Sequence, residues 1–172
     1  QAQLITAKPI LYVCNVNEED AAKGNALSEQ VFAKAKAEGA NAVVVSAAIE
    51  SELVGMPEED RMEFLSELGL TETGLARVIR AGYSLLHLIT FFTVGPKEAR
   101  AWTVENGAKA PQAAGVIHSD FERGFIRAET IAYDDYVALN GEAGARDAGK
   151  LRQEGKEYVV QDGDVLHFKF NV

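Results

Sequence analysis

Two polar stretches could recognise the base of a nucleotide, because each directly follows a short apolar run. The stretch Asn15-Val16-Asn17-Glu18 follows the run PILYVC at Pro9–Cys14, and Ser46-Ala47 stands at the end of the run NAVVVS at Asn41–Ser46. Continuous apolar runs of this length are typical of buried parallel strands. Ligands of α/β sheets bind outside the carboxyl ends of the strands. We therefore expect Asn15 at a binding edge, where the backbone amides of Ser46 and Ala47 could contact the same base.

The amide of Asn15 and its neighbours predict weakened guanine preference and tolerance of adenine. An asparagine amide can pair with adenine N6 and N7 together, accepting with its carbonyl oxygen and donating with its NH₂ group. Guanine selection needs an acid that accepts from two donors of the base, typically the Asp of an Asn-Lys-x-Asp pattern. Here the acid is the longer Glu18, and Val16 stands where the Lys stem would cover the base. The NVNEED stretch would also make a helix N-cap followed by first-turn acids, and spacing alone leaves both interpretations open.

One segment imitates a phosphate loop without its context. Gly144–Lys150 matches the spacing GxxxxGK, but Leu151 follows in place of the Ser or Thr that would hold Mg²⁺, and no apolar strand precedes it. Phosphoryl transfer depends on positioned phosphate and metal. We therefore expect that this chain alone does not hydrolyse nucleotide, and we assign it no catalytic residue.

The histidines and the single cysteine indicate no additional site. His87, His118 and His167 are far apart and lack metal-ligand spacing, so we expect no metal site. Cys14 ends the first apolar run, where a core thiol is the expected role. One cysteine allows no internal disulfide and fits a reducing cytoplasm.

The first half of the chain alternates strands and helices. A helix is predicted from about Asp20 to Glu38, between the two apolar runs, and strand-helix-strand implies a parallel sheet. Two strands do not complete such a sheet, so we expect the remainder upstream of Gln1. Helices are also predicted to begin at Ala47, at Pro57 and at Thr73 or Gly74.

The second half has the order of a β-grasp fold, which makes the fold class α/β plus α+β. Two strands within Leu86–Val104 flank Gly95-Pro96, and a helix at Ala110–Phe121 and a strand at Phe125–Ile131 follow. After a helical turn at Tyr133–Leu139 and a doubtful helix at Glu142–Leu151, two strands are predicted about the Asp162-Gly163 turn. The last strand is expected to run to Val172, unlike the flexible Gly-Gly end of ubiquitin-like carriers.

Composition predicts a soluble chain with an acidic first half. Apolar residues make up 47%, charged residues 25%, and the formal net charge is −9. No run of about 18 apolar residues predicts a membrane span, and the start QAQLITAKP, which lacks Met and is no signal peptide, suggests a fragment or a processed chain. Acidic residues outnumber basic ones 13 to 7 up to His87, which argues against bulk nucleic-acid affinity.

A basic group in the second half could still face RNA. A solvated surface is the alternative interpretation of the same residues. They are Arg100, Lys109, Arg123, Arg127, Lys150, Arg152 and Lys156.

Three long segments resemble the C-terminal half of the YchF / Obg-like ATPase family. They are KPILYVCNVNEED, FFTVGPKEARAWTVENGAKAPQAAGVIHSDFERGFIRAET and GKEYVVQDGDVLHFKFNV, and the resemblance covers essentially the whole chain. The resemblance implies a P-loop nucleotide hydrolase of the translation-factor class that uses ATP, or GTP with less preference, together with Mg²⁺. It also implies a cytoplasmic protein that associates with the ribosome or ribosomal RNA.

On this resemblance, residues 1–55 are the C-terminal part of the G domain, 56–87 a helical linker, and 88–172 a TGS domain. Asn15 would contact the base edge, Val16 its face or backbone neighbourhood, and Glu18 would belong to the same altered motif. Ser46 and Ala47 would form the second base-contact loop. The family's phosphate loop and metal ligands have no counterpart in this chain.

Two functions remain open at this point. The first is a nucleotide hydrolase whose TGS domain contacts the ribosome or RNA, with Arg100, Lys109, Arg123 and Arg127 as possible contacts. The alternative is a stand-alone β-grasp module that binds RNA or protein without catalysis.

Overall fold

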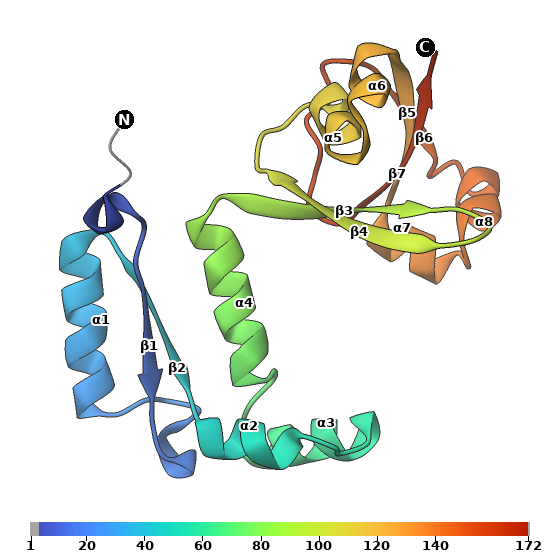
Figure 1. Cartoon of the computed structure of the whole chain (residues 1–172). Coiled ribbons are helices and arrows are strands. Elements are labelled where there is room, and N and C mark those ends of the chain that lie inside the picture. Colours follow the sequence, from blue (N-terminus) through green and yellow to red (C-terminus); the bar gives the residue numbers. More distant parts are fainter. Residues whose placement is uncertain (1–3, 172) are drawn as a thin grey trace. The chain divides into compact units, whose positions relative to one another are not determined.

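A computed structural model describes residues 4–171 of the chain. These residues divide into two compact units, one up to Leu86 and the other from His87 (Figure 1). No helix in this range is long and apolar enough to cross a membrane. The prediction that the last strand reaches Val172 falls partly outside the described residues, and β7 ends at Phe170.

The first unit contains the predicted parallel strand-helix-strand. Strands β1 (Leu11–Asn15) and β2 (Asn41–Val45) pair in parallel, with Leu11 opposite Asn41 and Asn15 opposite Val45. Helix α1 (Ala26–Glu38) connects them. Apolar, β-branched side chains favour this parallel pairing. The prediction that these strands are buried is wrong for the described residues, because every residue of β1 and β2 is half-buried or exposed.

Helices α1 and α4 (Gly74–Leu85) pack on opposite faces of this pair (Figure 1). The hydroxyl of Tyr12 donates to Glu38 of α1 at 2.6 Å, which places Tyr12 on the α1 face. A Cβ on Gly74 of α4 would lie 3.2 Å from the Cβ of Val45, on the other face. Side chains alternate along each strand, so Ala42 and Val44 face α1.

The helix predicted from Asp20 begins later than expected. Glu18–Asp20 form a 3-10 turn, and Gly24 then takes φ +74°, which interrupts the chain before α1. The cap of α1 is Asn25, whose side chain accepts from the backbone amides of Leu27 and Ser28 at 3.1 and 3.0 Å. The apolar period alone did not reveal this capping box.

Short helices complete the first unit. They are a 3-10 turn at Ile5–Ala7, α2 (Ala47–Leu53) and α3 (Glu58–Glu67). The Glu50 carboxylate of α2 accepts from the amides of Gly74 at 2.6 Å and Leu75 at 3.3 Å, and so caps α4. The buried core of these helices consists of Ala21, Ile49, Leu53, Leu65 and Leu70.

The second unit is a five-stranded mixed sheet with the order β4-β3-β7-β5-β6. Its strands are β3 (Leu88–Val94), β4 (Ala99–Glu105), β5 (Phe125–Ala132), β6 (Arg152–Glu154) and β7 (Asp164–Phe170). Strand β7 pairs in parallel with β3 and antiparallel with β5. An antiparallel hairpin beside a central parallel last strand is the β-grasp topology, so that prediction is confirmed.

Helices cover both faces of this sheet. They are α5 (Ala110–Ile117), α6 (Ser119–Arg123), α7 (Tyr133–Ala138) and α8 (Glu142–Asp147). The main core lies under α5 and includes Phe91, Ala113, Phe125, Leu166 and Phe168. A second cluster, with Ile131, Ala145 and Val165, lies under α7 and α8.

Two predictions for the second unit are wrong in detail. The helix at Ala110–Phe121 breaks at His118, where the backbone is extended and the ring Nδ1 accepts from the amide of Asp120 at 3.1 Å. The final two strands do not form a hairpin. The segment before Asp162 makes one bridge, between Val159 and Lys109, and the turn itself binds the backbone of Thr90 through Asp162 and Gly163.

Candidate functional site

The carboxyl ends of β1 and β2 are joined by the side chain of Asn15. Its Oδ1 accepts from the backbone amide of Ala47 at 3.0 Å. One residue further, the amide of Val16 donates to the carbonyl of Val45 at 2.9 Å. These bonds bring together two stretches that lie 32 residues apart in the sequence.

A hollow of about 500 Å³ lies at this edge. Its lining includes three of the predicted base-binding residues, Asn15, Val16 and Glu18. Asn15 and Glu18 are exposed, and Val16 is half-buried. The structure thus places these three residues in one hollow. The other lining residues are Asn17, Glu19 and Ala48.

The predicted residues Ser46 and Ala47 do not line the hollow. Ala47 contributes its backbone amide to Asn15 instead. The hydroxyl of Ser46, 2% exposed, has no hydrogen-bond partner among residues 4–171. Ala48, one residue into α2, takes the lining position. Its place depends on where α2 begins relative to the strand end, which no motif in the sequence marks.

The groups around the hollow fit a base rather than a phosphate. The Nδ2 amide of Asn15 donates to no other described residue and is available to a ligand. Glu18 and Glu19 bring two carboxylates to the rim. Like charges repel at short range, so these carboxylates disfavour a triphosphate at this position while remaining able to accept from a base or a ribose.

The helix-cap interpretation of NVNEED is confirmed only in part. Asn17 stands at the N-cap position of the 3-10 turn Glu18–Asp20, whose residues are all acids, but its side chain makes no capping hydrogen bond. Asn25 caps α1 instead. The amides of Asn15 and Asn17 are therefore not needed to start a helix.

The segment that imitates a phosphate loop has a structural role. Gly144 lies in α8, and a Cβ there would collide with the backbone carbonyl of Leu139. Lys150 pairs with Asp135, with 3.3 Å between Nζ and Oδ1. Close packing and a surface ion pair account for these residues without a ligand.

The structure brings no metal-binding group together in the range it describes. His87 lies in a turn with φ +53°, His118 caps α6, and His167 lies 3.8 Å from a carboxylate oxygen of Glu129. Each histidine has a separate local setting.

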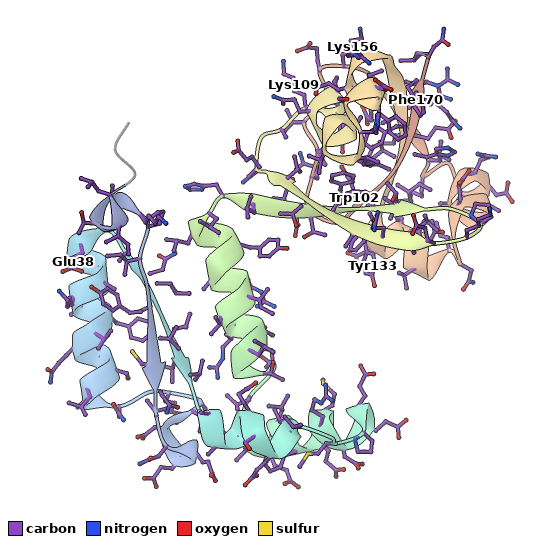
Figure 2. All side chains as sticks on the ribbon, viewed as in Figure 1. Glu38, Trp102, Lys109, Tyr133, Lys156 and Phe170 are labelled. Atoms are coloured by element: carbon purple, nitrogen blue, oxygen red, sulfur yellow. The ribbon has the colours of Figure 1, made fainter. Side chains whose placement is uncertain are left out.

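The four basic residues proposed to contact RNA have different surroundings. Lys109 lies at the start of α5 (Figure 2) and pairs with Glu157. Arg123 pairs with Asp120. Arg100 lies over the ring of Trp102, with 4.9 Å from guanidinium carbon to ring centroid. The side chain of Arg127 makes no ion pair or hydrogen bond with another residue of the described range, although its backbone lies in the ladder with β7.

Arg127 lies on the face of the sheet away from α5. In the β5–β7 ladder it pairs with Lys169, whereas the neighbouring Ala128 pairs with Phe168 of the main core. A register shift between Phe125 and Arg127 sets this orientation. Spacing in the sequence did not show that Arg127 is separated from the other three residues.

A parallel strand-helix-strand with a polar edge, followed by a β-grasp unit, makes this chain an α/β unit joined to an α+β unit. The family model YchF-GTPase_C, described as "Protein of unknown function (DUF933)", matches residues 88–171. The chain belongs to the YchF / Obg-like ATPase family.

Relatives match the chain along almost its whole length. The "Ribosome-binding ATPase YchF" of Haemophilus influenzae is 59% identical over 98% of this chain and 46% of its own length. The protein of the same name from Bacillus subtilis is 57% identical over 100% of this chain and 48% of its own. The solved "Structure of the Schizosaccharomyces pombe YchF GTPase" matches with a TM-score of 0.76 at 38% identity, over 95% of this chain and 44% of that one. The chain therefore spans about half the length of the curated relatives it matches.

Proposed function

We propose that the full-length protein binds and hydrolyses ATP, with GTP less preferred and Mg²⁺ as the metal, and that it acts on the ribosome in the cytoplasm. The bacterial relatives, which are named as ribosome-binding ATPases, support this proposal. The stand-alone binding module is not favoured, because the chain matches about half of each of these proteins.

We assign residues 1–55 to the G domain, 56–87 to a helical linker and 88–172 to the TGS domain. The unit boundary after Leu86 and the family match at 88–171 support the last division. Within this division, the G-domain part contributes base recognition and the TGS domain contributes the ribosome contact.

The hydrogen bond from Ala47 to Asn15 carries the argument for adenine. Both purines present N7 as an acceptor, which the free Nδ2 of Asn15 can satisfy. Guanine also presents the O6 acceptor. The Ala47 amide that could donate to O6 already donates to Asn15 Oδ1. Adenine presents an N6 donor, which the second lone pair of Asn15 Oδ1 or the Glu18 carboxylate can accept. A guanine O6 without a donor in this hollow would lose a hydrogen bond that it makes in water.

Calorimetry on the full-length protein tests this base site. We expect ATP to bind at least as tightly as GTP. The variant Asn15→Ala should weaken binding of ATP by about tenfold to a hundredfold, since one bidentate base contact contributes about 1–3 kcal/mol. The double variant Val16→Lys with Glu18→Asp should move preference towards GTP.

A matched control is Glu59→Asp, the same shortening of an exposed acid on α3, which should leave both affinities unchanged. Strong GTP preference in the unaltered protein would contradict the base-site proposal. So would an Asn15→Ala variant that binds ATP normally.

Arg127 is the basic residue we favour for the ribosome contact. It is exposed and unpaired among the described residues, and Lys169 lies opposite it in the ladder. We expect Arg127→Glu to reduce co-sedimentation with ribosomes, and the unaltered protein to dissociate as salt is raised. Arg123→Glu serves as the comparison, because Arg123 is already paired with Asp120. Equal sedimentation of Arg127→Glu and the unaltered protein would remove this face from the proposal.

A further inference from the structure

The outer edge of β2 is open along its length. Its inner edge pairs with β1, where the amide of Asn41 donates to Ile10 at 3.2 Å and the carbonyl of Val45 accepts from Val16 at 2.9 Å. Backbone groups alternate in direction along a strand, so Ala42 and Val44 turn their N–H and C=O groups to the outer edge. Within residues 4–171 no strand pairs there.

Strand β2 carries none of the features that protect sheet edges. Its sequence, NAVVV, has no charge, no proline and no bulge. An unprotected edge rich in β-branched residues is a template for pairing with another strand. Its backbone therefore suits an added strand.

Two adjoining hollows follow this edge between α1 and α4. One, of about 520 Å³, is lined by residues 42–44 of β2, and the other, of about 530 Å³, extends to Asn41. Both are lined by Phe32 of α1 and by Ala81 and Ser84 of α4. Because α1 and α4 pack on opposite faces, these hollows form one trough with β2 as its floor and a helix on each side. Adjacent strands lie about 4.7–4.9 Å apart, so the trough is placed where a third strand would lie.

The trough is basic, although the unit that carries it is acidic. Lys23, Arg77 and Arg80 line one end and Lys36 the other. The one acid among these lining residues, Glu72, is paired with Arg80 at 2.8 Å. This local excess of positive charge complements an acidic occupant.

Two side chains indicate what the occupant presents to each wall. On the α4 side, the Nε of Arg77 is buried and has no hydrogen-bond partner in the described part of the chain, and an unsatisfied buried donor is costly until an acceptor reaches it. On the α1 side, the ring of Phe32 is 42% exposed. A strand that alternates acidic and apolar side chains would present carboxylates to one wall and apolar groups to the other.

We propose that the β2 edge binds an extended acidic segment of a partner protein, which adds to the sheet as a third strand. Main-chain hydrogen bonds to Ala42 and Val44 hold the segment, and the alternate side chains select its sequence. This binding does not depend on the nucleotide proposal, because the trough and the base hollow share no lining residue.

Amide hydrogen exchange on the full-length protein, followed by NMR, tests the proposal with an acetylated octapeptide of alternating Glu and Val as the probe. At saturation, exchange at Ala42 and Val44 should slow by about tenfold or more as these amides become bonded. Exchange at Val43, which is already bonded to β1, should not change. Raising the salt concentration should weaken peptide binding.

Two variants and two controls sharpen this test. Arg80→Glu reverses a charge of the trough and Ala81→Trp fills it, so each should abolish the protection of Ala42 and Val44. Lys34→Glu changes an exposed charge of α1 that does not line the trough, and should leave protection intact. A Lys and Val octapeptide should give no protection.

Three results would overturn the proposal. Protection of Ala42 and Val44 before the peptide is added would mean that the protein's own chain occupies this edge. Unchanged exchange under saturating Glu and Val peptide would show that no strand is added. Equal protection by the Lys and Val peptide would show that the edge does not select an acidic segment.

Discussion

The β-grasp unit has buried apolar clusters on both faces of its five-stranded sheet, whereas no residue in the two strands of the first unit's sheet is buried. Phe91 and Leu166 are at most 1% exposed in the β-grasp unit. In the first unit, Val13 of β1 is 49% exposed, and Leu75 and Ile79 of α4 are 60% and 52% exposed. A two-stranded sheet is only marginally stable without additional packing.

Stability and ligand chemistry are divided between the two units. The β-grasp unit holds its residues in a core with few unsatisfied polar groups. The first unit presents the free Nδ2 group of Asn15, the carboxylates of the hollow and the unpaired edge of β2. These binding groups all lie in the first unit, and the two units should respond differently to substitution.

The largest expected effect follows removal of a core ring from the β-grasp unit. Phe91 is fully buried and packs edge-to-face on Phe168, with ring centroids 6.0 Å apart. Phe91→Ala should lower the free energy of unfolding of this unit by about 3–5 kcal/mol. Trp102 is the only tryptophan and lies in this unit, so its fluorescence during urea unfolding reports the effect.

The matched control for this prediction lies in the other core. Leu65 is 2% exposed in the first unit, and Leu65→Ala should leave the Trp102 transition unchanged. If Leu65→Ala shifted that transition as far as Phe91→Ala, the two units would unfold as one and the comparison would fail.

A pH-dependent effect is expected in the β-grasp unit at Tyr158. Burial, and then the hydrogen bond to Asp164 at 2.7 Å, raise the pKa of Tyr158 from 10.0 to about 12. The folded state therefore keeps a proton that the unfolded state loses. Stability from this group is complete below pH 10 and is lost as pH rises towards about 12.

Urea midpoints at pH 8 and at about pH 11, again followed by Trp102, measure this loss. The urea midpoint of Tyr158→Phe should be lower than that of the unaltered protein at pH 8, because Asp164 loses a hydrogen-bond donor. Its midpoint should fall less between pH 8 and the higher pH. Tyr133→Phe, at a tyrosine that is 50% exposed, is the comparison. An equal alkaline loss in the protein with and without Tyr158 would exclude this tyrosine as its source.

The fold was predictable where local pattern and packing agree. The apolar runs before Asn15 and Ser46 predicted the parallel strands, and the rule for strand ends placed Asn15, Val16 and Glu18 in one hollow. The break at His118 and the short strand β6 were missed, because each depends on a contact that is not a periodic pattern.

Tertiary contacts explain the errors at the turn and at the site. The Asp162-Gly163 turn favours a hairpin locally, but its groups bind Thr90, 72 residues away in the sequence. From the sequence, the backbone amide of Ala47 was expected to contact a base. In the structure this amide donates to Oδ1 of Asn15 at the end of the neighbouring strand. Neither partner can be identified from local propensity.

The smallest effect distinguishes two asparagines of the first unit. Asn25 accepts two amide hydrogen bonds at the start of α1, whereas Asn17 makes no capping bond. Asn25→Ala should destabilise the first unit by about 1 kcal/mol, and Asn17→Ala should have almost no effect. Hydrogen exchange of the α1 amides measures both changes, while Trp102 fluorescence should report neither. A loss of protection in Asn17→Ala as large as in Asn25→Ala would return Asn17 to a structural role and weaken the case that the residues after β1 are free for a ligand.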